Sequence, residues 1–300
     1  MTAERLTTFE RDGLVFDVRD EGPLDGPTVV LLHGFPETSA SWSDVIPRLT
    51  AAGYRSVAPD QRGYSRHARP RGRRAYRRDQ LVGDVLALID RIGVDRVHLV
   101  GHDWGAAVAW AVATEHPNRV LTLTSLSIPH PAAFRRAALT SGQGFRSWYM
   151  GFFQIPGVPE ALLRSGDWRR FRRNLLRSGL SPAFADRYIA VLRQPGALTA
   201  AINWYRGMRP LADSRPTSVS TPTLLIWGSR DAFVHPKGVR DTARFVSGPY
   251  RLEVLEGGSH WIPEEAPDRV AELLGAHFAS ASQGSSHPPK RPGSRRVRKG

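Results

Sequence analysis

Short apolar segments alternate with amphipathic helical patterns along most of this 300-residue chain, and this alternation restricts the possible folds more than any other feature. The apolar segments have the length of single buried strands, whereas stretches such as 77–93 and 263–280 have the periodicity of helices. Strands that alternate with helices form a mostly parallel sheet flanked by helices. The predicted strands are 13–20, 27–34, 54–60, 95–102, 119–128, 222–229 and 250–258.

The alternation stops between about residues 130 and 216, where no clear strand pattern occurs and prolines and glycines interrupt helical stretches. The strand pattern then resumes. We therefore predict a discontinuous α/β core, 1–129 plus 217–280, and a helical cap inserted at 130–216. A hydrophobic content of 41% is sufficient for a sizeable core in a chain of this length.

The net charge of +14 could suggest a nucleic-acid partner, but its distribution does not. Basic residues are concentrated in 65–79 and 164–177, which are flanked by loop signals, and in the tail 281–300. The tail is rich in Pro, Ser and Gly and has no apolar periodicity, so we predict it to be disordered. Since no nucleic-acid-reading motif accompanies the charge, we expect a solvated basic surface and no specific nucleic-acid partner.

The chain contains no cysteine, so neither disulfides nor thiolate chemistry is available to it. No apolar run approaches the ~18 residues that a membrane-spanning helix needs. We therefore expect a cytoplasmic protein without a membrane span.

Asp103 stands between Gly101 and Gly105 in the segment "VGHDWGAAVAW", where a predicted strand meets a predicted helix. A sharp strand-to-helix turn leaves no room for side chains beside its central residue, and such a turn can lift a nucleophile into a pocket. The helix N-terminus also favours an ionised carboxylate. These residues alone leave two interpretations of Asp103 open, a helix N-cap and a nucleophile.

Two further polar residues follow the ends of the last predicted strands. Asp231 comes after 222–229, and His260 lies in a Gly-Gly-Ser loop after 250–258. Loops at the carboxyl ends of parallel strands converge on one crevice, so we expect both side chains near Asp103. The chain order nucleophile, acid, histidine is that of the α/β-hydrolase fold.

The segments "HGFPE", "GHDWG", "RDAFV" and "GGSHWIPEE" together resemble the epoxide hydrolase and haloalkane dehalogenase branch of the α/β-hydrolases, over about residues 6–280. The nucleophile of that branch is an aspartate. The resemblance implies that Asp103 attacks an sp³ carbon to form an alkyl ester, and that His260, oriented by Asp231, activates the water that cleaves it.

Opening an epoxide requires a donor to the ring oxygen as negative charge grows on it, and a phenol can both donate a hydrogen bond and supply the proton. Tyr149 in "SWYMGFFQIPG" and Tyr205 in "AAINWYRGM" resemble the paired ring-opening tyrosines of epoxide hydrolases. We predict that both are catalytic. Tyr188 is interpreted as an ordinary packed aromatic residue.

Attack of water on the ester creates an oxyanion, which needs two donors. We expect these to be the backbone N–H groups of Trp104 and Phe35. The resemblance also implies a cis Phe35–Pro36 bond, and we expect His33 to be structural. No residue cluster has metal-ligand spacing and no glycine pattern suits a nucleotide, so we predict neither metal nor cofactor.

The predicted reaction converts a small apolar epoxide and water into a vicinal diol. Haloalkane dehalogenase is the nearest alternative, since Trp148, Trp168 and Trp204 in the cap could bind halide, although Phe35 stands where a second donor is typical. A haloacetate dehalogenase is another alternative, but it would be expected to carry arginines just after the nucleophile, where this chain has Trp104 to Ala107. A non-catalytic receptor on the same fold is a further alternative.

Overall fold

The computed structural model describes residues 4–207 and 218–284. Its centre is an eight-stranded sheet with the order β1-β2-β4-β3-β5-β6-β7-β8. Strands β1 and β2 are antiparallel to each other, β2 is antiparallel to β4, and all other neighbours are parallel. The mostly parallel sheet is thereby confirmed. The strands are β1 (Thr8–Arg11), β2 (Leu14–Glu21), β3 (Thr28–Leu32), β4 (Arg55–Pro59), β5 (Val97–His102), β6 (Val120–Leu126), β7 (Thr223–Gly228) and β8 (Tyr250–Leu255).

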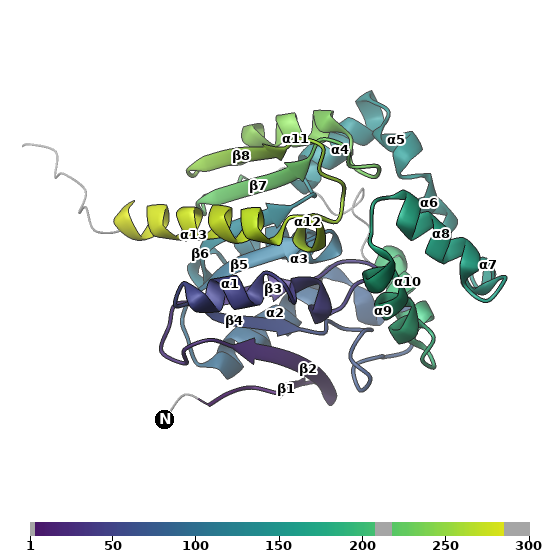
Figure 1. Ribbon diagram of the computed structural model, residues 1–300, viewed down its shortest axis with the longest axis horizontal. Coiled ribbons are helices and arrows are strands. Elements are labelled where there is room, and N and C mark those ends of the chain that lie inside the picture. Colours follow the sequence, from purple (N-terminus) through teal and green to yellow (C-terminus); the bar gives the residue numbers. More distant parts are fainter. Residues whose placement is uncertain (1–3, 208–217, 285–300) are drawn as a thin grey trace, which may run out of the picture.

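Helices cover both faces of the sheet, as Figure 1 shows. Helices α1 and α13 lie on the face turned toward the viewer, and α2 and α3 lie behind the sheet. Each face has its own buried apolar cluster, because β3 and β5 are buried on both sides. The core helices are α1 (Ile46–Ala51), α2 (Arg78–Ile92), α3 (Trp104–Glu115), α11 (Pro236–Asp241), α12 (Ile262–Glu265) and α13 (Pro267–Gly284), with short 3₁₀ turns at Ser39–Trp42, Arg73–Tyr76, Pro117–Arg119 and Thr242–Phe245.

Between β6 and β7 the described chain forms helices and irregular segments, as the sequence predicts for this stretch, apart from an isolated bridge between Val219 and Val246. These helices gather at one end of the sheet (Figure 1). They are α4 (Pro131–Thr140), α5 (Gln143–Arg146), α6 (Trp148–Phe152), α7 (Val158–Arg164), α8 (Arg169–Arg177), α9 (Pro182–Leu192) and α10 (Ala197–Gly207). The predicted boundary at 216/217 lies outside the described residues.

Two details differ from the sequence prediction. Strand β1 was not predicted; it forms a hairpin with β2 through Asp12 and Gly13, both of which have positive φ, and an Asp-Gly pair is a known signal for such a turn. Helix α13 continues to Gly284, past the predicted end of the core at 280; the rest of the predicted tail lies outside the described residues. Among the described helices, none is long and apolar enough to cross a membrane.

Candidate active site

Asp103 occupies a strained turn between β5 and α3. Its φ of 48° and ψ of −120° are unusual for a non-glycine residue. The flanking glycines are required by space, because a Cβ at Gly101 would lie 2.4 Å from the carbonyl oxygen of Gly105, and a Cβ at Gly105 would lie 2.3 Å from that of Leu32. The Asp103 side chain makes no capping hydrogen bond to α3. The N-cap interpretation of the carboxylate therefore does not describe this structure.

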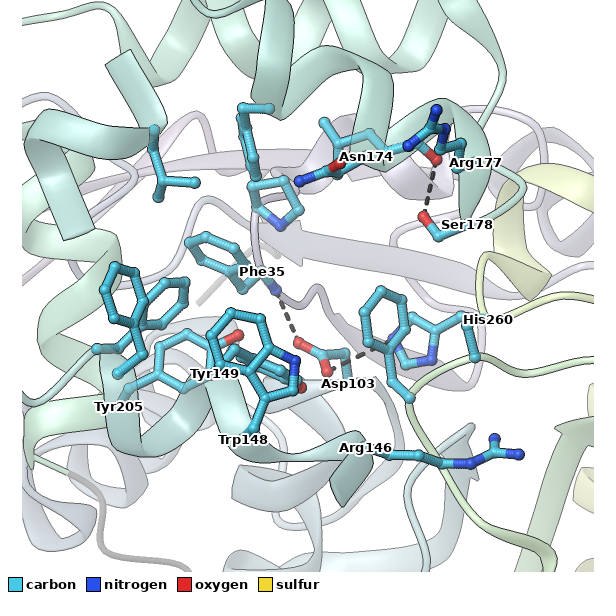
Figure 2. A pocket seen from close by; sticks show the side chains of 18 of the residues that line it. Phe35, Asp103, Arg146, Trp148, Tyr149, Asn174, Arg177, Ser178, Tyr205 and His260 are labelled. Atoms are coloured by element: carbon cyan, nitrogen blue, oxygen red, sulfur yellow. Dashed lines mark hydrogen bonds and ion pairs between the residues drawn. The ribbon is translucent and has the colours of Figure 1, made fainter. Parts of the chain in front are cut away.

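The carboxylate of Asp103 is held from two sides. Its Oδ1 accepts a hydrogen bond of 2.9 Å from the backbone N–H of Phe35, and its Oδ2 lies 3.5 Å from Nε2 of His260 (Figure 2). A Cβ at Gly34 would lie 2.4 Å from the Cβ of Asp103, so the Phe35 loop can approach only because residue 34 is glycine. The Phe35–Pro36 bond is cis, as the resemblance implies.

His260 lies between two carboxylates. Its Nδ1 is 2.8 Å from Oδ2 of Asp231, whose other oxygen accepts hydrogen bonds from the backbone N–H groups of Phe233 and Val234. His260 and Asp231 are both buried. Asp231 is thus fixed by its own loop, and it fixes the orientation of the imidazole ring.

Charge and burial act in opposite directions on these groups. Burial by itself would lower the pKa of His260, but the charge of Asp231 and the hydrogen bonds to Asp103 and Asp231 outweigh it and hold this pKa well above its usual value. Burial would raise the pKa of Asp103, but the hydrogen bond and charge of His260 outweigh it and lower this pKa. Both pKa shifts favour the charged forms, an imidazolium at His260 and an ionised carboxylate at Asp103.

The helical segment between β6 and β7 places Tyr149 on α6 and Tyr205 on α10, and their ring centroids are 6.0 Å apart. In Figure 2, Asp103 lies between His260 and these two tyrosines. Burial, reinforced by neighbouring charges that include Asp103, raises the pKa of both phenols. Each tyrosine therefore keeps its proton at neutral pH and can act as a hydrogen-bond donor.

Trp104 is buried at the start of α3, where backbone N–H groups have no acceptor within the helix. Its indole ring packs edge-on against Tyr205, with ring centroids 4.8 Å apart. His33 is also buried; its Nε2 accepts a hydrogen bond from the backbone N–H of Gln61, which suits a structural role beneath the Phe35 loop.

A cavity of about 540 Å³ opens above Asp103. Its floor contains Asp103 and His260, and aromatic and aliphatic side chains dominate its walls. Such a volume and lining suit a small apolar molecule. The lining includes Phe35, Tyr149, Phe152, Phe153, Phe171, Leu175, Tyr205, Phe233 and Trp261. Among the described residues, no group of three or more His, Cys, Asp and Glu side chains could hold a metal ion.

Sequence reasoning missed a buried ion pair beneath the site. Nδ1 of His102 lies 2.8 Å from Oε1 of Glu37, and its Nε2 donates to the backbone carbonyl of His260 over 2.9 Å. Glu37 also accepts a 2.6 Å hydrogen bond from the backbone N–H of Gly34. Glu37 and His102 thus connect the Phe35 loop to the His260 loop. Glu37 lies just past the end of β3, and His102 lies at the end of β5. Because these two strands are neighbours in the sheet, their adjacency is the sequence-level signal that could have paired the two residues.

The fold and the site together define an α/β hydrolase. Residues 27–267 match the family described as alpha/beta hydrolase fold. The AB hydrolase superfamily protein YfhM of Bacillus subtilis is 38% identical over 270 residues, which cover 88% of this chain and 94% of that protein.

Other similar proteins have more specific names. Epoxide hydrolase 4 of Mus musculus is 35% identical over 88% of this chain and 76% of its own length. A solved structure of an epoxide hydrolase from a metagenome of a hot environment has a TM-score of 0.79 at 30% identity and covers 93% of this chain and 99% of its own. The chain belongs to the epoxide hydrolases of the α/β-hydrolase fold family.

The tryptophans that favoured a haloalkane dehalogenase do not form a halide site. The Nε1–H of Trp204 donates to the backbone carbonyl of Arg62 over 2.7 Å and so is not available to a ligand. Trp168 is buried and does not line the cavity, whereas Trp148 lines it but is 67% exposed.

Proposed function

We propose that the protein hydrolyses a small apolar epoxide to a vicinal diol through a covalent ester on Asp103. The observation that carries this proposal is the position of the Asp103 carboxylate among four groups: a backbone donor, an imidazole and two phenols. The Phe35 N–H contacts Oδ1 of Asp103, His260 faces Oδ2, and two protonated tyrosines line the same cavity.

In the first half-reaction, Oδ2 of Asp103 attacks an epoxide carbon and the bond between that carbon and the ring oxygen breaks. Tyr149 and Tyr205 donate hydrogen bonds to the ring oxygen, and one of them transfers its proton to it. Oδ1 stays bound to the Phe35 N–H. The products are an alkyl ester of Asp103, a hydroxyl on the adjacent carbon and one tyrosinate.

In the second half-reaction, His260 removes a proton from water, and the water oxygen attacks the carboxyl carbon of Asp103. The backbone N–H groups of Phe35 and Trp104 stabilise the resulting oxyanion. The ester oxygen leaves with the diol and takes a proton from the imidazolium. The carboxylic acid left on Asp103 then gives its remaining proton to the neutral His260, which restores the carboxylate and the imidazolium, and no cofactor takes part in these steps.

The charges around His260 set the order of these events. Before ester formation, the carboxylates of Asp103 and Asp231 stabilise the protonated form of His260, so this imidazolium cannot accept a proton from water. Ester formation removes the charge of Asp103, and the pKa of His260 falls. The imidazolium can then return its proton to the tyrosinate and act as a base toward water. His260 becomes a base only after there is an ester to cleave.

In this proposal, residues 130–216 are a cap domain over a core of 1–129 and 217–280, and the enzyme acts in the cytoplasm. The cap supplies Tyr149 and Tyr205, and the core supplies Asp103, Asp231 and His260. The helical character of the described chain between β6 and β7 supports this division.

A single turnover in ¹⁸O-labelled water tests the proposal. With excess enzyme and styrene oxide, the label should enter the carboxylate of Asp103, because water attacks the carboxyl carbon of the enzyme. The diol should take its new oxygen from the protein. Label in the diol, with none in the fragment containing Asp103, would show direct attack of water and would overturn the ester mechanism.

A further inference from the structure

The large exposed apolar side chains of the described chain are concentrated in one region. All but Val254 lie in the stretch from α4 to α7. Three of them leave most of their apolar surface in water: Phe145 is 87% exposed, Leu139 81% and Trp148 67%. Large apolar side chains that are exposed together in one region often mark an interaction site. We call this set the apolar rim: Leu139, Phe145, Trp148, Ile155, Val158 and Leu162.

The apolar rim adjoins the catalytic cavity, because three of its six residues also line that cavity. Phe145, Trp148 and Leu162 line that cavity as well as being exposed. Figure 1 shows α5, α6, α7 and α8 along the end of the molecule where the helical segment gathers, and Figure 2 shows Trp148 among the side chains that line the cavity. A surface that contacted these three residues would therefore lie against the cavity that holds Asp103 and His260.

Helix α8 adds positive charge beside the rim. Arg170 and Arg177 are exposed and line the same cavity, and within the described part of the chain neither guanidinium makes an ion pair. The acidic residues nearby do not neutralise them. Glu160 is 2.7 Å from Arg206, and Asp167 is 2.8 Å from Arg193.

We propose that the apolar rim and the arginines of α8 dock the protein on an anionic lipid surface, so that an apolar epoxide enters the cavity from the bilayer. The rim side chains would enter the boundary between headgroups and acyl chains, where tryptophan is favoured, and Arg170 and Arg177 would contact lipid phosphates. The docking goes beyond the proposed hydrolysis and does not depend on it.

The charge and the residue types of this surface favour an anionic membrane over two other partners, a second copy of the chain and a nucleic acid. A second copy of the chain would place the cationic surface of α8 against itself, and like charges repel. Nucleic acid would contact arginine and stack on aromatic rings, but it offers no apolar environment for Leu139, Ile155 and Val158. A bilayer with anionic headgroups complements both features at once.

Co-sedimentation with vesicles tests the proposal. We use phosphatidylcholine alone and phosphatidylcholine with phosphatidylglycerol in a ratio of about 7:3, chosen to give a clearly negative surface potential. Wild-type protein should bind the mixed vesicles and be released when NaCl is raised to about 1 M, where screening acts within ~3 Å. Equal binding to both kinds of vesicle would contradict the role of charge.

Two variants separate the apolar and the electrostatic parts. The triple variant Leu139→Ser, Ile155→Ser, Val158→Ser changes rim residues that do not line the cavity, and its binding should weaken on the order of tenfold. The double variant Arg170→Gln, Arg177→Gln should weaken binding about fivefold for each arginine removed.

Matched controls change the same residue types elsewhere. Arg91 and Arg119 lie before the amino ends of β5 and β6, at the edge of the sheet away from the site, so Arg91→Gln with Arg119→Gln lowers the net charge equally. Val254→Ser removes the one large exposed apolar side chain that lies outside the rim among the described residues. Both controls should bind the mixed vesicles like wild type. If they weaken binding as much as the rim and α8 variants, general charge and not this surface is responsible.

Two further measurements identify the partner and the consequence. A concentration-dependent dimer that the triple variant abolishes, with no vesicle binding, would assign the rim to self-association and overturn the proposal; tight binding to RNA with no vesicle binding would also overturn it.

With styrene oxide in solution, the triple variant should turn over like wild type, whereas turnover of a long-chain epoxide dissolved in vesicles should fall with binding. If the protein binds vesicles but hydrolyses no epoxide, the docking stands and the proposed function fails.

Discussion

Nε2 of His260 lies 3.5 Å from Oδ2 of Asp103, so the proposed base of the second half-reaction faces the carboxylate that we propose to form the ester in the first. This contact makes the two half-reactions separable by mutation. Removal of the imidazole should leave attack by Asp103 largely intact while it prevents activation of water.

His260→Gln should therefore trap the ester. With excess epoxide, the variant should gain the mass of one substrate molecule, and peptide mapping should place this mass on the fragment that contains Asp103. Asp103→Asn is the control and should gain no mass at first. A His260→Gln protein that stays unlabelled while it still binds substrate would contradict the role of Asp103 as the nucleophile.

The tyrosines should matter through their hydroxyl groups. Tyr149→Phe and Tyr205→Phe keep the ring packing, and each should reduce the rate of ester formation by about 10² to 10³, or ~3 to 4 kcal/mol, with the double variant nearly inactive toward epoxides. Rapid-quench measurement of the ester gives this rate directly.

Tyr54→Phe is the matched control, because Tyr54 packs against Phe278 on the opposite face of the sheet. It should behave like wild type. Unchanged epoxide hydrolysis in both Tyr149→Phe and Tyr205→Phe would remove the reason for assigning ring opening to this pair.

The two half-reactions should differ in their dependence on pH. In the free enzyme the pKa of Asp103 is lowered and that of His260 is raised, so acidification from pH 7 to about 5 leaves the ion pair intact and ester formation constant. In the ester the pKa of His260 is lower, and acidification should protonate it and slow hydrolysis. The ester should then accumulate at low pH in single-turnover experiments. Parallel slowing of both steps would be inconsistent with this ordering.

Glu264 should make the protein less stable as pH rises. Its Oε1 accepts a hydrogen bond of 2.7 Å from Tyr188, and its buried Oε2 has no hydrogen-bond partner among the described residues. Burial, with the nearby charge of Glu37, raises the pKa of Glu264 to about 8 from an unfolded value of 4.5.

Between those two pKa values the folded state binds a proton that the unfolded state has lost, so stability falls as pH increases from 4.5 to about 8. The loss should be on the order of a few kcal/mol. Glu264→Gln should flatten this part of the stability profile in urea titrations. A profile as steep as that of wild type would mean that other groups dominate.

The sequence predicted the sheet, the helical stretch before β7 and the residues that converge on the cavity, because periodicity and strand ends are local patterns. It did not predict β1, since Thr8–Arg11 is too short to show a period of its own. Glu37 and His102 were not paired because their contact joins two different strands. Tyr188 was interpreted as a packed aromatic residue, and its bond to Glu264 depends on how α9 lies against the core. Contacts across elements are decided by packing, which no local pattern records.

The chain leaves the sheet at β6 and returns to it at β7, and these strands are direct neighbours, with Leu123 beside Thr223. All of the helices from α4 to α10 are thus joined to the sheet at two adjacent points. Evolution can replace that whole segment, or lengthen it, without moving the strands that carry Asp103, Asp231 and His260. Such a replacement would exchange Tyr149 and Tyr205 together with the cavity walls that the segment supplies, so the molecules accepted and the donors that act on them can change as one unit. A laboratory chimera would need only two junctions to exploit this.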